Sequence, residues 1–303
     1  MKPFPQWIKR QLPIKEINEM NELLKDSGLH TVCISAHCPN IGECFKNKEA
    51  TFLILGNICT RNCLFCSVKK GVPNPPDSKE PEKIADAVKK LGLDYVVITS
   101  VTRDDLADGG AGHFVNTIRA IRNKNPKVRI ETLAPDFNNN LNAINKIILE
   151  KIDVFAHNIE TVPRLYESIR PRAMPCGSPH GEAVGRQADY NNSLNILKYV
   201  KNNSDILIKS SIILGFGETE QEILETITSL RSAGCDIIAI GQYLKPTKGC
   251  VEVREFVNPD KFDYYADFAK SIGINAVLSA PFVRSSYKAR EIYEEISNGS
   301  HVA

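Results

Sequence analysis

The chain has 303 residues, of which 42% are hydrophobic, enough for one large domain with a sizeable core. Its 38 basic and 36 acidic side chains leave a formal net charge of +2, which gives no general electrostatic attraction to nucleic acid or to a membrane. Residues 1–11 contain no apolar stretch resembling a signal peptide, and no later run approaches the length of a membrane span. We therefore expect a soluble cytoplasmic protein that binds neither nucleic acids nor membranes.

Six of the nine cysteines form two groups of three, spaced C-x4-C-x5-C and C-x3-C-x2-C. An odd number of cysteines without an export signal favours reduced, metal-binding thiolates over disulfides. Three thiolates hold three irons of a cubane iron–sulfur cluster and leave the fourth open to an external ligand. For the second group the alternative is a zinc site, which normally takes four Cys or His ligands. The two groups are Cys33, Cys38 and Cys44, and then Cys59, Cys63 and Cys66.

After the cysteine region, short β-branched runs alternate with longer amphipathic segments, a pattern typical of βα units around a parallel sheet. Helices are expected at Glu80–Leu91 and Glu218–Ala233, where apolar residues recur on one face. The sequence therefore predicts an α/β fold, a partial (β/α)6 barrel of the TIM type with N-terminal and C-terminal extensions. The expected strands are Thr51–Asn57, Asp94–Ser100, Val128–Ala134, Asp153–Asn158, Ile206–Leu214 and Asp236–Gln242, with a seventh candidate at Asn275–Ser279.

Two segments interrupt this pattern. Arg172–Arg186 has no periodicity and several Gly and Pro residues, which indicates an inserted surface loop. Cys176 and His180 lie in this loop, and two such residues without further partners are weak evidence for a metal site. Near the C-terminus, Ser285 and Ser286 precede a predicted helix at Tyr287–Ile296, so N-capping of that helix is one interpretation of these serines.

The segment from Cys59 to Cys66 directly follows the first predicted strand, where its thiolates can converge at the mouth of the barrel. This arrangement resembles the radical S-adenosylmethionine (SAM) superfamily. In that superfamily SAM chelates the open iron of a [4Fe–4S] cluster, and its cleavage gives a 5′-deoxyadenosyl radical that abstracts hydrogen from unactivated carbon. The resemblance implies that Phe65 packs beside the adenine, although a lone aromatic can equally belong to the core. The residues expected to contact SAM, by their position at strand ends, are Thr99, Ser100, Asn158 and Glu160.

The Gly215–Glu218 turn is a further candidate for SAM binding, and a structural strand-to-helix connection is an equally good interpretation of it.

The first group of cysteines, combined with Arg284-Ser285-Ser286-Tyr287, looks like the lipoyl synthase family. The likeness covers nearly the whole chain and departs plainly only at 172–186. It implies insertion of two sulfur atoms, at C6 and C8 of a protein-bound octanoyl group, with one SAM consumed per hydrogen abstracted. The sulfur is implied to come from a second, auxiliary [4Fe–4S] cluster. The implied ligands of that cluster are Cys33, Cys38, Cys44 and Ser286.

The same resemblance implies the partners. They are octanoylated lipoyl carrier domains, such as the E2 subunits of 2-oxoacid dehydrogenases and the glycine cleavage H protein, and an electron donor such as ferredoxin or flavodoxin. We expect an N-terminal extension at 1–50, a radical SAM barrel at 51–280 and a C-terminal extension at 281–303. Two alternatives are a biotin-synthase-like sulfurtransferase acting on a free small molecule and a non-enzymatic iron–sulfur scaffold or electron carrier. Stoichiometric cleavage of SAM distinguishes an enzyme from a scaffold.

Overall fold

The structure is a computed structural model that describes residues 5–8, 27–47, 49–172 and 187–299, together with Ile14, Asn18, Glu22 and Leu24. The predicted loop at 172–186, including Cys176 and His180, lies outside the described residues apart from Arg172 itself.

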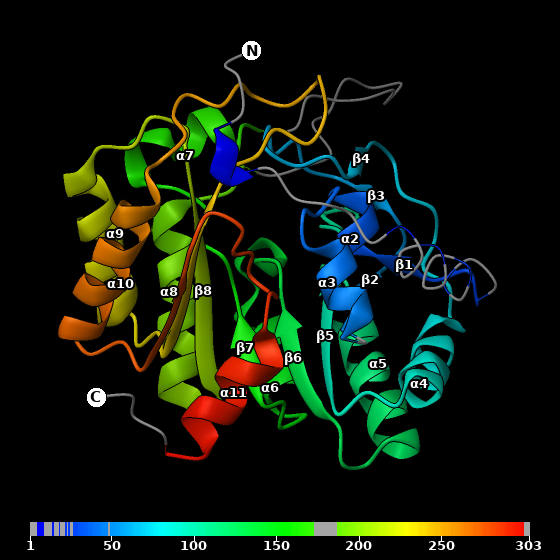
Figure 1. Cartoon of the computed structure of the whole chain (residues 1–303). Coiled ribbons are helices and arrows are strands. Elements are labelled where there is room, and N and C mark those ends of the chain that lie inside the picture. Colours follow the sequence, from blue (N-terminus) through cyan, green and yellow to red (C-terminus); the bar gives the residue numbers. More distant parts are fainter. Residues whose placement is uncertain are drawn as a thin grey trace.

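The described residues form one eight-stranded sheet in the order β1-β2-β5-β6-β7-β8-β9-β10. All neighbours in it are parallel except β1, which pairs antiparallel with β2. The sheet curves but does not close, since β1 and β10 are its two edges (Figure 1). This confirms the predicted partial barrel, and the seventh candidate strand is present as β10. The strands are β1 His30–Thr31, β2 Thr51–Ile54, β5 Tyr95–Ser100, β6 Arg129–Leu133, β7 Val154–Ala156, β8 Leu207–Leu214, β9 Ile237–Gln242 and β10 Ala276–Ser279.

The first parallel strand is shorter than predicted, ending at Ile54 instead of Asn57. Leu55 and Gly56 both take positive φ angles, 66° and 86°, which turn the chain out of the extended conformation. The Leu55 N–H donates to the buried Glu80 carboxylate over 2.8 Å, so this turn has its own hydrogen-bond partner. The chain then enters a small parallel ribbon, β3 (Ile58–Cys59) with β4 (Lys69–Lys70), which brackets the second group of cysteines.

Helices cover the outer face of the sheet, with α4 and α5 towards one end and α8, α9 and α10 towards the other (Figure 1). The predicted helix at Glu80–Leu91 is present with those bounds. The other predicted helix begins two residues late, at Glu220, because Thr219 and Glu222 form a capping box. The helices of the described residues are η1 Gln6–Ile8, α2 Val32–Ser35, α3 Ile41–Lys46, α4 Glu80–Leu91, α5 Ala111–Lys124, η2 Phe137–Asn139, α6 Leu141–Ile148, α7 Pro163–Ile169, α8 Tyr190–Asn203, α9 Glu220–Ser232, α10 Pro259–Ser271 and α11 Ala289–Ser297.

The main core lies between the sheet and these outer helices. The inner face is covered differently, by the C-terminal helix α11. Ile292 of α11 packs with Val154, Ile237 and Ala276, and Ala289 packs with Tyr95. These sheet residues are the first residues of β7, β9, β10 and β5, so α11 closes the N-terminal end of the barrel and leaves the opposite end for a site.

Candidate functional site

The second group of cysteines lies on a loop that backbone hydrogen bonds fix from both sides. The Leu64 N–H donates to the Ile169 carbonyl at the end of α7, and the Leu64 carbonyl accepts from Val251, over 2.9 and 3.0 Å. Within the loop the Cys66 N–H donates to the Cys63 carbonyl. Burial raises the pKa of the Cys66 thiol to about 12. A thiol with a raised pKa stays protonated unless a metal binds, because metal binding displaces the proton.

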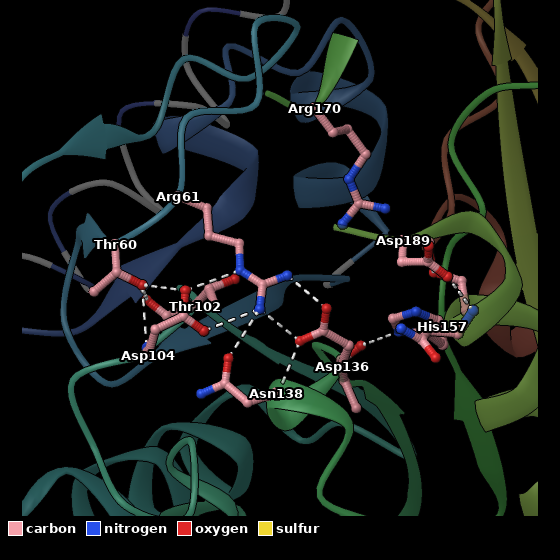
Figure 2. A network of polar contacts seen from close by, with 12 residues as sticks. Thr60, Arg61, Thr102, Asp104, Asp136, Asn138, His157, Arg170 and Asp189 are labelled. Carbon is pink, nitrogen blue, oxygen red and sulfur yellow. Dashed lines mark hydrogen bonds and ion pairs between the residues drawn. The ribbon is translucent and has the colours of Figure 1, made fainter. Parts of the chain in front are cut away.

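Arg61, between the first two of these cysteines, anchors the loop to the barrel. Its guanidinium lies between the carboxylates of Asp104, which follows β5, and Asp136, which follows β6 (Figure 2). The nitrogen–oxygen distances are 2.9 Å to Asp104 and 2.5 Å to Asp136, and all three side chains are less than 10% exposed. Burial opposes ionisation of Asp136, but the Arg61 charge outweighs it and lowers the pKa of that carboxyl. Charged groups on two strand ends thus place the cysteine loop over the barrel mouth.

The segment after β5 supports the same loop through its backbone. The Thr102 N–H donates to the Cys59 sulfur over 3.4 Å, and the Thr102 carbonyl accepts from the Thr60 hydroxyl over 3.0 Å. The Thr60 hydroxyl in turn accepts from the Asp104 N–H. Hydrogen bonds to a cluster-binding sulfur stabilise its negative charge and help to set the reduction potential of the cluster.

Three of the residues expected to contact SAM, namely Thr99, Ser100 and Phe65, have different surroundings. The Thr99 hydroxyl donates to the Leu133 carbonyl of the neighbouring strand over 2.8 Å, so its hydrogen already has a structural acceptor. The Ser100 hydroxyl is buried and has no hydrogen-bond partner in the described structure. Phe65 belongs to an aromatic cluster in which its ring centroid lies 6.3 Å from that of Phe216, and Phe216 packs on Tyr243. Phe65 is therefore half-buried in apolar surroundings suited to an aromatic base.

Asn158 and Glu160, after β7, are brought together. The Asn158 amide donates to Oε1 of Glu160 over 3.2 Å, whereas Oε2 is buried without a partner in the described structure. Burial raises the pKa of the Glu160 carboxyl. Glu160 also has a φ angle of 70°, an uncommon conformation for a side chain of this size. A buried acceptor without a donor fits a ligand that carries amino or hydroxyl groups, as SAM does.

The Gly215–Glu218 turn has a structural role. The Glu218 carboxylate accepts from the N–H groups of Gly215, Phe216 and Gly217 over 3.0 to 3.1 Å. Its other oxygen accepts from the Thr161 hydroxyl. The backbone donors that a ligand would use are therefore already bonded to the protein's own carboxylate.

Arg170, which the sequence analysis missed, lies at the end of α7. Its Nη1 donates to the Tyr166 hydroxyl over 2.5 Å, and its Nε is buried without a partner in the described structure. Burial opposes the charge, but Tyr166, Cys63 and Glu160 raise the pKa of Arg170. The guanidinium therefore stays charged near both the cysteine loop and Glu160. In sequence it is one arginine before a proline, which nothing distinguishes from a surface residue.

A second group of polar residues lies inside the barrel, where Glu131 meets Lys209 and Tyr95, two residues to which the sequence analysis assigned no role. The ammonium of Lys209 on β8 is 3.0 Å from the carboxylate of Glu131 on β6, and the Tyr95 hydroxyl donates to the same carboxylate over 2.7 Å. Lys209 and Glu131 are fully buried. Each charge is compensated by the other, as buried ions require.

The first group of cysteines precedes the barrel, on and around the short helices α2 and α3. Cys33 and Cys44 line a cavity of about 240 Å³, together with Ser286 from the C-terminal segment and Tyr95 and Val97 from β5. The Cys38 N–H donates to the Cys33 carbonyl over 3.0 Å. Burial raises the pKa of Cys33 to about 12. Two thiols and a hydroxyl from opposite ends of the chain thus share one cavity.

The capping interpretation of Ser285 and Ser286 is wrong. Helix α11 begins at Ala289, and its N-cap residue is Lys288, at a φ of 51° and without a side-chain capping bond. The predicted start at Tyr287 is two residues early, because Lys288 lies in the left-handed region where a helix cannot run. The serine side chains are therefore free of a capping role.

Contacts between residues next to the cysteines bring the two groups of cysteines together. The Ser67 hydroxyl, next to Cys66, donates to the Ser35 carbonyl over 2.8 Å, and His37 Nδ1 lies 3.3 Å from the same hydroxyl oxygen. Cys235 and Cys250, which belong to neither group of three, are buried free thiols. In the described part of the chain, no three His, Cys, Asp or Glu side chains are grouped closely enough to hold a single metal ion. None of the described helices has the length and apolar character needed to cross a membrane.

Comparison with known proteins gives a consistent result. The Radical SAM superfamily matches residues 53–230. Lipoyl synthase of Caldicellulosiruptor saccharolyticus is 50% identical, with 95% of this chain and 96% of that protein aligned. Mitochondrial lipoyl synthase of Rattus norvegicus is 43% identical, covering 96% of this chain and 76% of that one.

Among solved structures, Streptococcus suis SuiB bound to S-adenosylmethionine superposes with a TM-score of 0.55 at 12% identity, over 88% of this chain and 61% of that chain. Methylornithine synthase gives 0.53 at 12% identity, over 96% and 94%. At such low identity these structures establish the fold alone.

The open parallel barrel, with its cysteine loop at the mouth, is that of a radical SAM enzyme, whose cofactors are SAM and [4Fe–4S] clusters. Within that superfamily the chain belongs to the lipoyl synthase family.

Proposed function

We propose that this chain inserts two sulfur atoms into an octanoyl group, at C6 and C8, to form the lipoyl cofactor on a carrier protein. The observation that carries the proposal is the shared cavity of Cys33, Cys44 and Ser286. A radical SAM enzyme needs only one group of three cysteines to cleave SAM. A second thiol site, assembled from both ends of the chain beside the barrel, is what a sulfur-inserting member requires.

Two sets of residues would hold the clusters. Cys59, Cys63 and Cys66 would hold the cluster that binds SAM. The auxiliary cluster would be held by a set of four, namely Cys33, Cys38, Cys44 and Ser286. When bound, the first cluster and SAM supply a radical able to abstract hydrogen from an unactivated C–H bond, and the auxiliary cluster supplies sulfur.

The remaining residues would bind and orient SAM and exclude water from the barrel. Glu160 supplies an acceptor for the amino or hydroxyl groups of SAM, the Asn158 amide nitrogen lies beside it as a donor, and Arg170 offers a positive charge suited to the SAM carboxylate. Ser100 supplies a free hydroxyl, Thr99 shapes the wall beside it, and Phe65 packs against the base. Helix α11 closes the far end of the barrel, which keeps water from a reactive intermediate.

The substrate is an octanoylated carrier protein, and we infer that it is a lipoyl domain of a 2-oxoacid dehydrogenase E2 subunit or the glycine cleavage H protein. Ferredoxin or flavodoxin would supply electrons. Thiolate-rich metal sites favour a reducing compartment, so we place the enzyme in the cytoplasm. We divide the chain into an auxiliary-cluster extension at 1–50, the barrel at 51–280 and a C-terminal extension at 281–303.

The test is anaerobic reconstitution with iron and sulfide, followed by incubation with SAM, a reductant and an octanoyl-lysine peptide, with products weighed by mass spectrometry. A peptide that gains two sulfur atoms while 5′-deoxyadenosine accumulates supports the proposal. Accumulation of 5′-deoxyadenosine without sulfur transfer contradicts the proposed substrate. An intact SAM pool contradicts the radical chemistry and supports the scaffold alternative.

A further inference from the structure

Ser285 makes a contact that joins the two candidate sites. Its hydroxyl donates to Oδ1 of Asn158 at the end of β7 over 2.9 Å, although 127 residues separate them. The amide nitrogen of the same Asn158 donates to Glu160. The nitrogen of the Asn158 carboxamide is therefore bonded to Glu160, a proposed SAM contact, and its oxygen is bonded to the C-terminal segment. The next residue, Ser286, lines the cavity of Cys33 and Cys44.

The backbone before Ser285 is fixed by close contact with the barrel. The Gln242 N–H donates to the Pro281 carbonyl over 3.0 Å, and the Asn40 amide donates to the Phe282 carbonyl over 2.6 Å. A Cβ atom at Gly241 would lie 2.0 Å from the Val283 carbonyl oxygen, so only glycine allows this approach. The segment from β10 to α11, red in Figure 1, is thereby held along the inner side of the sheet.

The backbone after Ser286 is fixed as well, because Ala289 and Ile292 of α11 pack into the N-terminal end of the barrel. Between these two anchors, the Ser285 side chain ties the turn directly to a strand end of the barrel. A hydroxyl that is one residue from a proposed cluster ligand and bonded to a proposed SAM contact can order both.

We propose that Ser285 is a positioning residue: its hydrogen bond to Asn158 fixes the turn that presents Ser286 and, at the same time, orients the Asn158 carboxamide for SAM. This inference rests on the proposed function for the identity of the two ligands. It does not depend on the carrier protein or on sulfur transfer, so it can be tested without either of them.

The test compares Ser285→Ala with Ser285→Thr, which keeps the hydroxyl, and with Ser279→Ala as a matched control. Ser279 is half-buried, six residues upstream, and also donates one hydrogen bond, to the Phe262 carbonyl over 2.7 Å. Three quantities are measured on reconstituted protein: hydrogen exchange of peptides covering 281–288, the dissociation constant of SAM by calorimetry, and the rate of iron release to a chelator.

Loss of one hydrogen bond predicts for Ser285→Ala a SAM dissociation constant about fivefold higher, with faster exchange at 281–288 and faster iron release. Ser285→Thr restores all three and Ser279→Ala changes none. Unchanged values in Ser285→Ala overturn the proposal, and so does an equal effect of Ser279→Ala, which would indicate general destabilisation. Failure of the octanoyl assay with these effects present rejects the proposed substrate and leaves the role of Ser285 intact.

Discussion

The Tyr287 hydroxyl donates a hydrogen bond of 2.7 Å to the Glu43 carboxylate, across 244 residues of sequence. Glu43 lies in α3, one residue before Cys44, and Tyr287 follows Ser286 directly. Together with the bond from Asn40 to the Phe282 carbonyl, this contact fastens the two ends of the chain to each other. The proposed auxiliary site therefore lies beside contacts between two segments that are far apart in the sequence.

Tyr287→Phe tests that pairing. Removing the hydroxyl leaves the Glu43 carboxylate without this donor, so we expect a loss of about 1 kcal/mol in the free energy of unfolding and faster iron loss from the auxiliary site. Urea denaturation and chelator kinetics measure the two effects. Tyr264→Phe is the control, because that ring is exposed. An unchanged iron-loss rate would show that the contact does not support the site.

Cys63→Ala tests the SAM-binding cluster. We expect it to abolish SAM cleavage while the auxiliary cluster remains, so that about half of the bound iron is retained. Chromatography of 5′-deoxyadenosine and iron analysis report the two results. Cys250→Ala, at a buried thiol outside both groups, is the control. Full SAM cleavage by Cys63→Ala would remove the open-iron assignment.

Cys38→Ala tests the sulfur donor. Because this residue belongs to the other set of proposed ligands, the variant is expected to cleave SAM but to give no sulfur-containing peptide. The assay is the same mass measurement used for the wild type. Lipoyl product from Cys38→Ala would contradict the assignment of the auxiliary cluster as the sulfur source.

Arg61→Met tests the anchor of the cysteine loop. It leaves Asp104 and Asp136 buried without their counter-charge, which costs about 3–5 kcal/mol in pairs of this kind. Urea unfolding measures the loss. Arg119→Met removes an exposed pair with Glu150 and should have a much smaller effect. Equal effects of the two variants would mean that the buried network adds nothing to stability.

His157 predicts a pH dependence of stability. Burial lowers its pKa from 6.5 to about 4, while Nδ1 lies 2.9 Å from the Ala134 carbonyl oxygen. Between these pH values the unfolded chain binds a proton that the folded chain does not. Stability is therefore complete above pH 6.5 and falls by about 3 kcal/mol as the pH drops towards 4. In His157→Asn, urea denaturation at several pH values should no longer show this fall in the free energy of unfolding between pH 6.5 and 4. An unaltered pH dependence would assign the fall to other groups.

Local patterns in the sequence predicted the elements well. The helix at Glu80–Leu91 follows from its apolar stripe, and the strands follow from β-branched runs between turn residues. The errors fell at ends, where Leu55 and Lys288 adopt left-handed conformations that no propensity indicates. The cysteine spacings indicated iron–sulfur chemistry because ligands on one short loop are set by local geometry.

The tertiary structure alone decided which distant residues meet. Arg61 finds Asp136, Ser285 finds Asn158, and Arg170 comes near Cys63 and Glu160. Arg61, Asp136 and Arg170 are ordinary polar residues in sequence, and nothing there pairs Ser285 with Asn158. Their roles arise because parallel strands end at one edge of the sheet and the C-terminal segment folds back across it, and burial there makes each polar atom require a partner. The chemistry of the cysteines can be predicted from their spacing along the chain. The side chains that hold the cysteines in place come together only through packing in the folded structure.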